Sequence, residues 1–470
     1  MTRLIGGTIN NTPIKDISDG SAFSAGGGAI IPTFAEIGTA SSWTQIAAIN
    51  PDMNTYLQTQ MDIYPLDSNG HFLAYQSTTS SGHLKYRGVT FDANDNPTFN
   101  SEQTYLSASR PTVVPAIKKN GNYYTMYYDN ANYTPVANHT VILRKHTGWD
   151  GTTLSGTSTL ATFGPTTNIS DSMVGGKLFD IPWETNTFLF TPTQGGEPSG
   201  IEFKVFDASS DTVVSTATSQ SRSAYASRTA WAIGLNSTIE SGLLILSDYQ
   251  TSTFGSYYVQ PFTISSGSMS FSTAKRLGFH QPTNASLQTW QYMPGQHAGQ
   301  IQVQGGIRMQ NSTHGSCVPF GRGFVYFFSN GYAWALKKAD GTWIYSPWHW
   351  YGIQNQYGSN QFITLGSSSF SAIEVIKLSD YHCIHKGYGI SHYFSFYVNL
   401  DDEDNPIVVY KPSRHSNASN ETKIHVPHTN SPQKVVQLSE NMTGSPSFDY
   451  RTLPITYTAK HLDNWANIPN

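Results

Sequence analysis

Three acidic side chains on segments expected to form strands could carry acid–base chemistry. They are Asp62, Asp180 and Glu184. Two carboxyl groups held at a fixed separation can protonate a glycosidic oxygen and activate water or attack the sugar. However, acids near strand ends more often cap turns or lie on the surface, and a sequence does not fix the distance between them. We therefore expect no enzymatic activity, and these acids remain the catalytic candidates of an alternative hypothesis.

A dense aromatic cluster offers a second kind of chemistry. It falls within nine residues and contains Trp343, Trp348, Trp350 and Tyr351. Flat aromatic faces stack on the apolar faces of sugar rings, so these side chains are candidates for binding a glycan. Burial between packed sheets is the alternative, which we favour because large aromatic side chains are mostly buried.

Imidazole and thiol groups form a third cluster, made of His382, Cys383, His385 and His392. Such groups are common zinc ligands. In a strand, His382 and His385 point to opposite faces, and no second cluster with paired short spacing supplies the missing ligands. We therefore predict no metal site and no other cofactor, and keep these four residues only as weak candidates for metal ligation.

Strands must position all of these residues, because helical periodicity is almost absent from the sequence. A proline-bearing strand, a turn and an aromatic strand recur in order. The clearest copies are Asp62–Tyr75 and Thr112–Tyr128. Each contains an Asn-Gly pair, at Asn69 and at Asn120, which favours the positive φ angles of a tight hairpin turn.

Six such hairpins, each followed by a second hairpin, organise the chain. The weaker first hairpins are Phe179–Phe190, Ile233–Leu246, Cys317–Phe328 and His382–Tyr397. The second hairpins are Leu84–Phe99, Val141–Leu154, Ile201–Val214, Tyr257–Phe271, Tyr332–Tyr345 and Ile407–Ile424. This repeat predicts an all-β fold, a β-propeller of six four-stranded blades, although five or seven blades would keep the class. A sandwich or a tandem of barrels is the alternative, but it does not explain the ordered repeat.

One repeat, Arg110–Tyr128, resembles the blades of glycosidase-type propellers in its proline, glycine turn and tyrosine-rich strand. The resemblance implies carboxylates on inner strands around a central channel. The matching strand here begins Ser109-Arg110-Pro111, without an acid beside its proline, which argues against hydrolysis. Ala339–Tyr345 resembles the aspartate-box hairpin of sialidase-like propellers, but it lacks the upstream serine, and a complete box is itself a structural turn.

The two ends of the chain differ from the repeats. The glycine-rich start has one apolar stretch, and it predicts an extended arm in which Ile30, Ile31 and Phe34 anchor on another subunit. The end of the chain is polar with short β-like pieces, and it either completes a blade or reaches for a neighbour. The expected division is an N-terminal arm over 1–40, a propeller over 41–425 and an irregular C-terminal segment over 426–470.

Composition excludes several classes of function. The formal net charge is only −4, so a nucleic-acid-binding face is not expected. No run of eighteen apolar residues predicts a membrane span, and the first residues lack the apolar segment of a secretory signal. Two cysteines, Cys317 and Cys383, cannot build a disulfide framework. We therefore expect a soluble protein made in the cytoplasm.

The low charged fraction of 12%, the many neutral polar residues and the glycine-rich start together resemble structural proteins of tailed bacteriophages. That resemblance implies a place in the virion, in the tail or in a fibre. It also implies assembly through terminal arms with other virion proteins and further copies of this chain, and contact with host surface glycans. A glycosidase-like propeller enzyme and a cellular interaction propeller are the alternatives.

Overall fold

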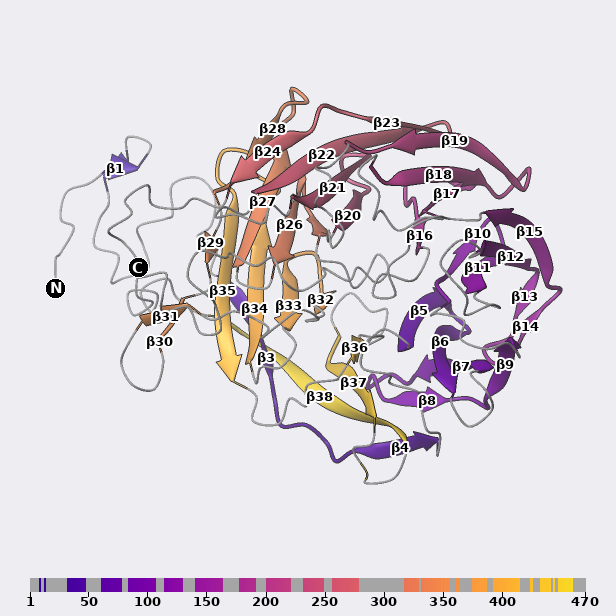
Figure 1. Cartoon of the computed structure of the whole chain (residues 1–470). Coiled ribbons are helices and arrows are strands. Elements are labelled where there is room, and N and C mark those ends of the chain that lie inside the picture. Colours follow the sequence, from indigo (N-terminus) through magenta and orange to yellow (C-terminus); the bar gives the residue numbers. More distant parts are fainter. Residues whose placement is uncertain are drawn as a thin grey trace.

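The protein is a β-propeller of seven blades arranged as a ring (Figure 1). The structure is a computed structural model, and the described part of the chain contains strands and turns but no helix. The all-β prediction is confirmed. The described residues are 8–9, 12–13, 32–47, 61–77, 83–106, 114–129, 140–163, 177–191, 200–220, 231–248, 256–278, 317–328, 331–347, 349–350, 352–354, 360–362, 374–386, 392–414, 423–425, 432–440, 443 and 447–459.

In blades 1 to 6 the antiparallel strands follow chain order from the axis to the rim. The first strands of neighbouring blades lie against one another around the axis, as β10 does with β5 and β16. Blade 1 is β5 (Met61–Asp67), β6 (Gly70–Ser77), β7 (His83–Phe91), β8 (Pro97–Phe99) and β9 (Gln103–Leu106). Blade 2 is β10 (Ala116–Lys119), β11 (Asn122–Asp129), β12 (Thr140–His146) and β15 (Ser158–Phe163), with a side hairpin of β13 (Gly148–Trp149) and β14 (Leu154–Ser155). Blade 3 is β16 (Lys177–Asp180), β17 (Thr187–Thr191), β18 (Glu202–Asp207) and β19 (Thr212–Thr218).

The next three blades repeat this plan. Blade 4 is β20 (Trp231–Asn236), β21 (Ser241–Asp248), β22 (Ser256–Ser265), β23 (Ser268–Phe271) and β24 (Lys275–Gly278). Blade 5 is β25 (Cys317–Phe320), β26 (Gly323–Phe328), β27 (Gly331–Lys337), β28 (Trp343–Tyr345) and β29 (His349–Trp350). Blade 6 is β32 (Glu374–Lys377), β33 (His382–Lys386), β34 (His392–Asn399) and β35 (Ile407–Arg414). Outside the blades lie two small hairpins, β1 (Thr8–Ile9) with β2 (Thr12–Pro13), and β30 (Gly352–Gln354) with β31 (Asn360–Phe362).

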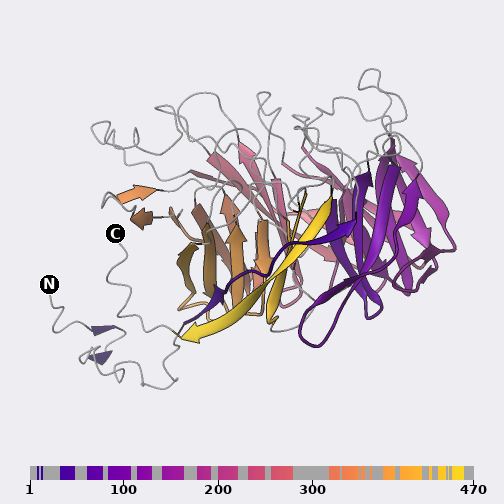
Figure 2. The same ribbon diagram turned by 90° about the horizontal axis from the view of Figure 1, so that it is seen from below.

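Strand direction gives the ring two faces. The first and second strands of a blade, and the third and fourth, are joined at one face, which we call the turn face. The second and third strands, and successive blades, are joined at the opposite loop face. Figure 2 shows the strands running between the two. At the turn face Asn120 and Gly121 adopt φ angles of 47° and 72°, as the Asn-Gly pair predicts, whereas at Asn69-Gly70 only the glycine has a positive φ.

The count of six blades is wrong by one because the seventh blade combines strands from both ends of the chain. The sixth repeat was also assigned one strand out of step, since its inner strand is β32 and the aromatic strand at Tyr393 is the third of its blade. Ile407–Ile424 is therefore not a hairpin. β35 ends blade 6, and β36 (Lys423–His425) begins blade 7.

Blade 7 is built from both ends of the chain. β36, β37 (Lys434–Glu440) and β38 (Phe448–Ala459) come from the C-terminal part, and β3 (Thr33–Ile37) and β4 (Thr44–Ala47) pair with β38 at the rim. The expected boundaries at 40 and 426 are therefore wrong, because strands on both sides of them belong to the ring. Phe34, expected to anchor on another subunit, is 1% exposed within this chain, while Ile30 and Ile31 lie outside the described residues.

The last five residues of β38, Ile455–Ala459, extend past β37 and pair with β3. We call this two-stranded piece, Thr33–Ile37 with Ile455–Ala459, the closing ribbon. It packs on blade 6, where Ala35 and Ile455 share a buried cluster with Ile384. Ring closure therefore depends on apolar burial as well as on strand pairing.

Candidate functional site

The turn face between blades 1 and 2 holds an ion pair reinforced by a phenol. Lys118 Nζ lies 2.9 Å from Asp67 Oδ2, and the Tyr123 hydroxyl donates to the same oxygen. Burial alone would raise the pKa of Asp67, but hydrogen bonds from Tyr123 and Lys118 hold it below its usual value. Asp67 is therefore an ionised acceptor at neutral pH, which suits it to joining blades rather than to donating a proton.

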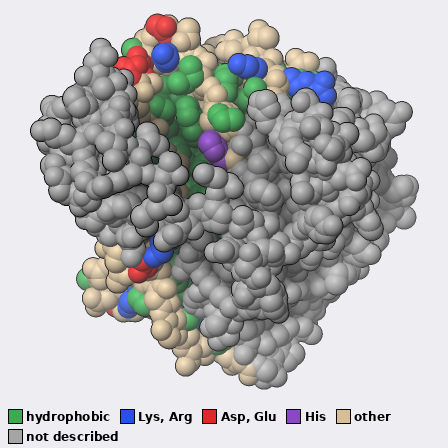
Figure 3. Space-filling model, turned by 90° about the vertical axis from the view of Figure 1, so that its left-hand side faces the viewer, with side chains coloured by type: hydrophobic (Ala, Val, Ile, Leu, Met, Phe, Trp, Pro, Cys, Tyr) green, Lys and Arg blue, Asp and Glu red, His purple; other side chains and the backbone are tan. Residues whose placement is uncertain are grey.

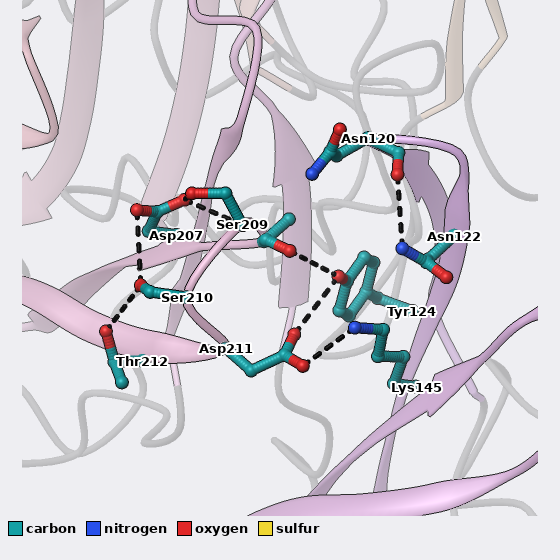
Figure 4. A network of polar contacts seen from close by, with 10 residues as sticks. Asn120, Asn122, Tyr124, Lys145, Asp207, Ser209, Ser210, Asp211 and Thr212 are labelled. Carbon is teal, nitrogen blue, oxygen red and sulfur yellow. Dashed lines mark hydrogen bonds and ion pairs between the residues drawn. The ribbon is translucent and has the colours of Figure 1, made fainter.

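The seam between blades 2 and 3 repeats this arrangement. Lys119 Nζ lies 2.7 Å from Asp180 Oδ1 and donates to the carbonyl of Ile181 at 2.9 Å. Farther from the axis, Lys145 pairs with Asp211 at 2.7 Å, and the Tyr124 hydroxyl reaches the same carboxylate (Figure 4). Each lysine comes from blade 2 and each acid from blade 3, so these contacts tie one blade to the next.

Aspartates also cap the turns between the third and fourth strands in five blades. Each carboxylate accepts backbone N–H groups two to four residues ahead. In blade 2 the capped turn is that of the side hairpin, and the turn of blade 4 has no such aspartate. These aspartates are Asp92, Asp150, Asp207, Asp340 and Asp402. Hydrogen bonding lowers the pKa of every one of them. The segment that resembles an aspartate box is one member of this set, so its role is structural.

A buried polar chain links blades 1 and 2 near the rim. Tyr105 and Thr125 share a hydrogen bond of 2.6 Å between their hydroxyl oxygens, and His146 lies between Thr125 and Thr157 with both contacts at 2.8 Å. Burial, with a contribution from the cation of Arg144, lowers the pKa of His146 to about 4. This histidine is neutral at physiological pH and has a hydrogen-bond partner at each ring nitrogen.

The structure does not bring the three candidate acids together. Asp62 lies near the loop-face end of β5, and only its backbone is described. Asp180 ends β16 at the turn face, where it is paired with Lys119, and Glu184 follows in the adjoining turn. Asp62 and Asp180 thus occupy opposite ends of inner strands that run in the same direction, an arrangement that does not form a carboxylate pair across one bond.

The aromatic cluster is only partly described. Trp343 lies in β28, half buried, with its ring stacked on Phe324 at 6.2 Å, so it packs against the core. Trp350 pairs through its backbone with Gly331, and its side chain lies outside the description, as do Trp348 and Tyr351. The glycan platform therefore stays a prediction.

Aromatic rings also fill the outer seam between blades 5 and 6. Tyr332 stacks on His349 at 5.0 Å and makes an edge contact with Tyr410 at 5.8 Å. Figure 3 views the side of the molecule that carries β29 and β35, and shows hydrophobic side chains and a histidine in a recess with charged groups near it. Much of the surface around this recess belongs to residues outside the description, so we assign it no ligand.

The imidazole and thiol groups of β33 face different neighbours. His382 contacts Thr33 of blade 7, with 2.7 Å between its Nε2 and the threonine hydroxyl. Cys383 is buried toward blade 5, as is His385, whose ring lies 5.0 Å from that of Phe327. His392 is described only by its backbone in β34. Within the described residues no three His, Cys, Asp or Glu side chains are grouped as metal ligands.

Sequence reasoning missed the closing ribbon and the lysine–aspartate pairs between neighbouring blades, which we call clamps. One signal was present, since an aspartate follows the third strand in five blades. The pairing of lysines in one blade with acids in the next had no sequence signature, because the partners are 51 to 66 residues apart. In the described part of the chain, no helix is long and apolar enough to cross a membrane.

No protein-family model matches the sequence, and no curated protein is similar to it. Among solved structures, the N-terminal domain of Nup159 covers 91% of this chain and 96% of its own, with 10% identity and a TM-score of 0.39. The soluble aldose sugar dehydrogenase of Escherichia coli covers 91% and 100%, with 6% identity and a TM-score of 0.36. An exo-β-1,3-galactanase of Phanerochaete chrysosporium covers 90% and 100%, with 11% identity and a TM-score of 0.31. Similarity at this level carries no argument about function.

Proposed function

We propose that this protein is a structural component of a tailed-bacteriophage virion, in the tail or in a fibre. It binds neighbouring virion proteins through its terminal segments and has no catalytic activity of its own. The composition supports the proposal, because a chain with 12% charged residues and many neutral polar groups suits an all-β particle component that needs no disulfides. Host surface glycans are the proposed external ligand.

One observation carries the proposal. Thr33 pairs with Ala459 at the tip of the closing ribbon, so the chain enters and leaves the ring at one point on the rim. Thr33 and Ala459, the ribbon residues nearest the two ends of the chain, thus lie side by side, and the ribbon that they belong to packs on blade 6; Figure 2 shows β3 and β38 crossing the ring together. A single neighbouring subunit placed there can bind both terminal segments.

Two further observations support a non-catalytic role. The acid that best fits an inner-strand position, Asp180, is paired with Lys119. The other described turn-face carboxylates named above accept hydrogen bonds from turns or from the next blade. If the protein is an enzyme, it should turn over a polysaccharide and lose that turnover in the variant Asp180→Asn, and this result would overturn the non-catalytic proposal.

The direct test is to raise antibodies against the recombinant protein and label purified phage particles from the source of the gene. We expect regular labelling of the tail region. Deleting residues 1–28 should abolish incorporation into particles and leave the melting temperature unchanged, since the ring begins at β3. Protein found only in host cells and never in particles would contradict the virion assignment.

A further inference from the structure

The outermost strand of a blade presents unpaired backbone N–H and C=O groups that another chain can use for pairing. In blades 1, 4, 5 and 7 this strand is broken into two short pieces. In blade 6 the outer strand β35 is continuous, but it contains Lys411 and Pro412. Breaks, charges and prolines of this kind protect an edge from unwanted pairing.

The outer strand of blade 3 lacks this protection. β19 runs Thr212-Val-Val-Ser-Thr-Ala-Thr218, with no break, no charge and no proline, and within the described residues it pairs only with β18. Val213 and Val214 are 37% and 47% exposed. In the described part of the chain the one other large hydrophobic side chain so exposed is Tyr381.

A bulge explains why two consecutive valines are exposed. Val205 pairs with Ser215 and Phe206 with Val213, so Val214 is the extra residue. The strand is held in place from the other side, because the Ser215 hydroxyl accepts the N–H of Met269 in blade 4 at 3.2 Å. The edge is therefore preformed and does not need to be ordered when a partner binds.

Blade 2 provides an internal comparison. Its outer strand β15 is also continuous and uncharged, and it carries a bulge at Leu160. However, Leu160 and Phe163 turn inward, and the Phe163 ring lies 5.2 Å from Phe190 of blade 3. β15 thus offers backbone groups without the exposed apolar side chains that β19 adds.

We propose that β19 is an interaction surface for a second copy of this chain, with the two β19 strands paired antiparallel about a two-fold axis. The absence of charge on β19 favours a second copy as this partner. In such a pair a strand faces its own copy, so a charge on it lies near the same charge and opposes pairing. The outer strand of blade 4 carries such charges at Lys275 and Arg276, and Lys411 of blade 6 is paired with Glu36 of blade 7, whereas β19 has no charged residue. Pairing also shields Val213 and Val214 of both copies from water.

The contact is small, and interfaces below about 1,200 Å² are typically weak. The test is therefore analytical ultracentrifugation of the full chain over a concentration range reaching about 1 mM, where a weak dimer is still populated. We expect a reversible dimer. The variants Val214→Lys and Thr216→Lys, both at exposed positions, should each weaken association at least about tenfold, because each brings two lysines, one from each copy, near the two-fold axis.

The matched control is Thr159→Lys, which places the same charge on the exposed edge of β15. It should leave association unchanged. Thr216→Lys faces Lys204 and Thr159→Lys faces Arg144 on the neighbouring strand, so these two variants should lower the melting temperature by similar, small amounts. A wild-type protein that stays monomeric, a dimer that survives both β19 variants, or equal loss in Thr159→Lys would each overturn the inference. The inference does not depend on the virion proposal, which is tested separately by particle labelling.

Discussion

Neighbouring blades must be held together at every seam of the ring. The seams of blades 1 to 3 achieve this differently from the seam that closes the ring at blade 7. Between blades 1 and 3, where the chain is continuous, lysine–aspartate pairs such as Lys119–Asp180 reinforce packed blades at the turn face. At blade 7 the strands come from opposite ends of the chain. There the structure uses strand pairing along β38, and the closing ribbon packs on blade 6.

The difference teaches where stability has to be concentrated. Two blades joined by the chain stay close together when a contact breaks, so a partly exposed ion pair is a sufficient addition. The closing strand β3 has no such tether to β38, because the whole ring separates them in sequence. Burial of Phe34 and Ala35 supplies a larger free energy there than an ion pair provides.

Removing the closing strand should have the largest effect. Deletion of residues 1–40 takes away β3 and exposes the part of blade 6 that the closing ribbon covers. We expect a loss of stability well beyond the roughly 4 kcal/mol of a single core truncation. Calorimetry measures it, with deletion of residues 1–31 as the control. If both deletions melt alike, β3 does not close the ring.

A single substitution in the same strand should come next. Phe34→Ala removes a ring that is 1% exposed and should reduce the free energy of unfolding by about 3–5 kcal/mol. Thr44→Ala, at an exposed position of β4, is the control and should change little. Chemical denaturation gives both values. An unchanged midpoint for Phe34→Ala would contradict the burial argument.

Acid should weaken the protein through buried histidines. Burial lowers the pKa of His146 to about 4 and that of His385 to about 3, whereas an unfolded histidine has a value near 6.5. The unfolded chain therefore takes up protons first, and stability falls as pH drops from about 6.5 toward 4. Melting temperatures across this range test the prediction, and His146→Gln should reduce the fall. A melting temperature independent of pH would refute it.

Breaking the clamp between blades 1 and 2 should have a smaller effect. Asp67→Asn weakens the contacts to Lys118 and Tyr123 and should cost about 1–2 kcal/mol. The lowered pKa means that this contribution is present above the ordinary value of 3.8 and is lost as pH falls through the folded value. Asp67→Asn should therefore be less sensitive to strong acid than the wild type. An identical acid transition would show that Asp67 does not contribute.

The smallest effect is expected at a capped turn. Asp340→Ala removes the acceptor of the Thr342 N–H at 2.8 Å in an exposed hairpin of blade 5. Because water can replace the lost acceptor, the melting temperature should fall less than for Asp67→Asn. A larger fall than that of Asp67→Asn would reverse the ranking of turns and clamps.

Sequence patterns predicted the fold class better than they predicted the candidate sites. Alternating strands, Asn-Gly turns and the aromatic strands at Tyr123 and Phe324 were enough to indicate blades, because turn chemistry and period are local properties. Blade 7 was missed because its strands lie at both ends of the chain. The candidate acids were chosen because they fall on expected strands. A strand assignment does not show at which face of the ring an acidic side chain lies.

By itself, the sequence determined an all-β repeat, its turns and its low charge, since each depends on neighbouring residues. Only the tertiary structure decided the number of blades, the burial of Phe34 within its own chain and the pairing of Lys119 with Asp180. It also decided which outer strand exposes valines. These properties depend on contacts between residues far apart in the chain, and the free energy of such contacts is set by packing and burial, which local patterns do not encode.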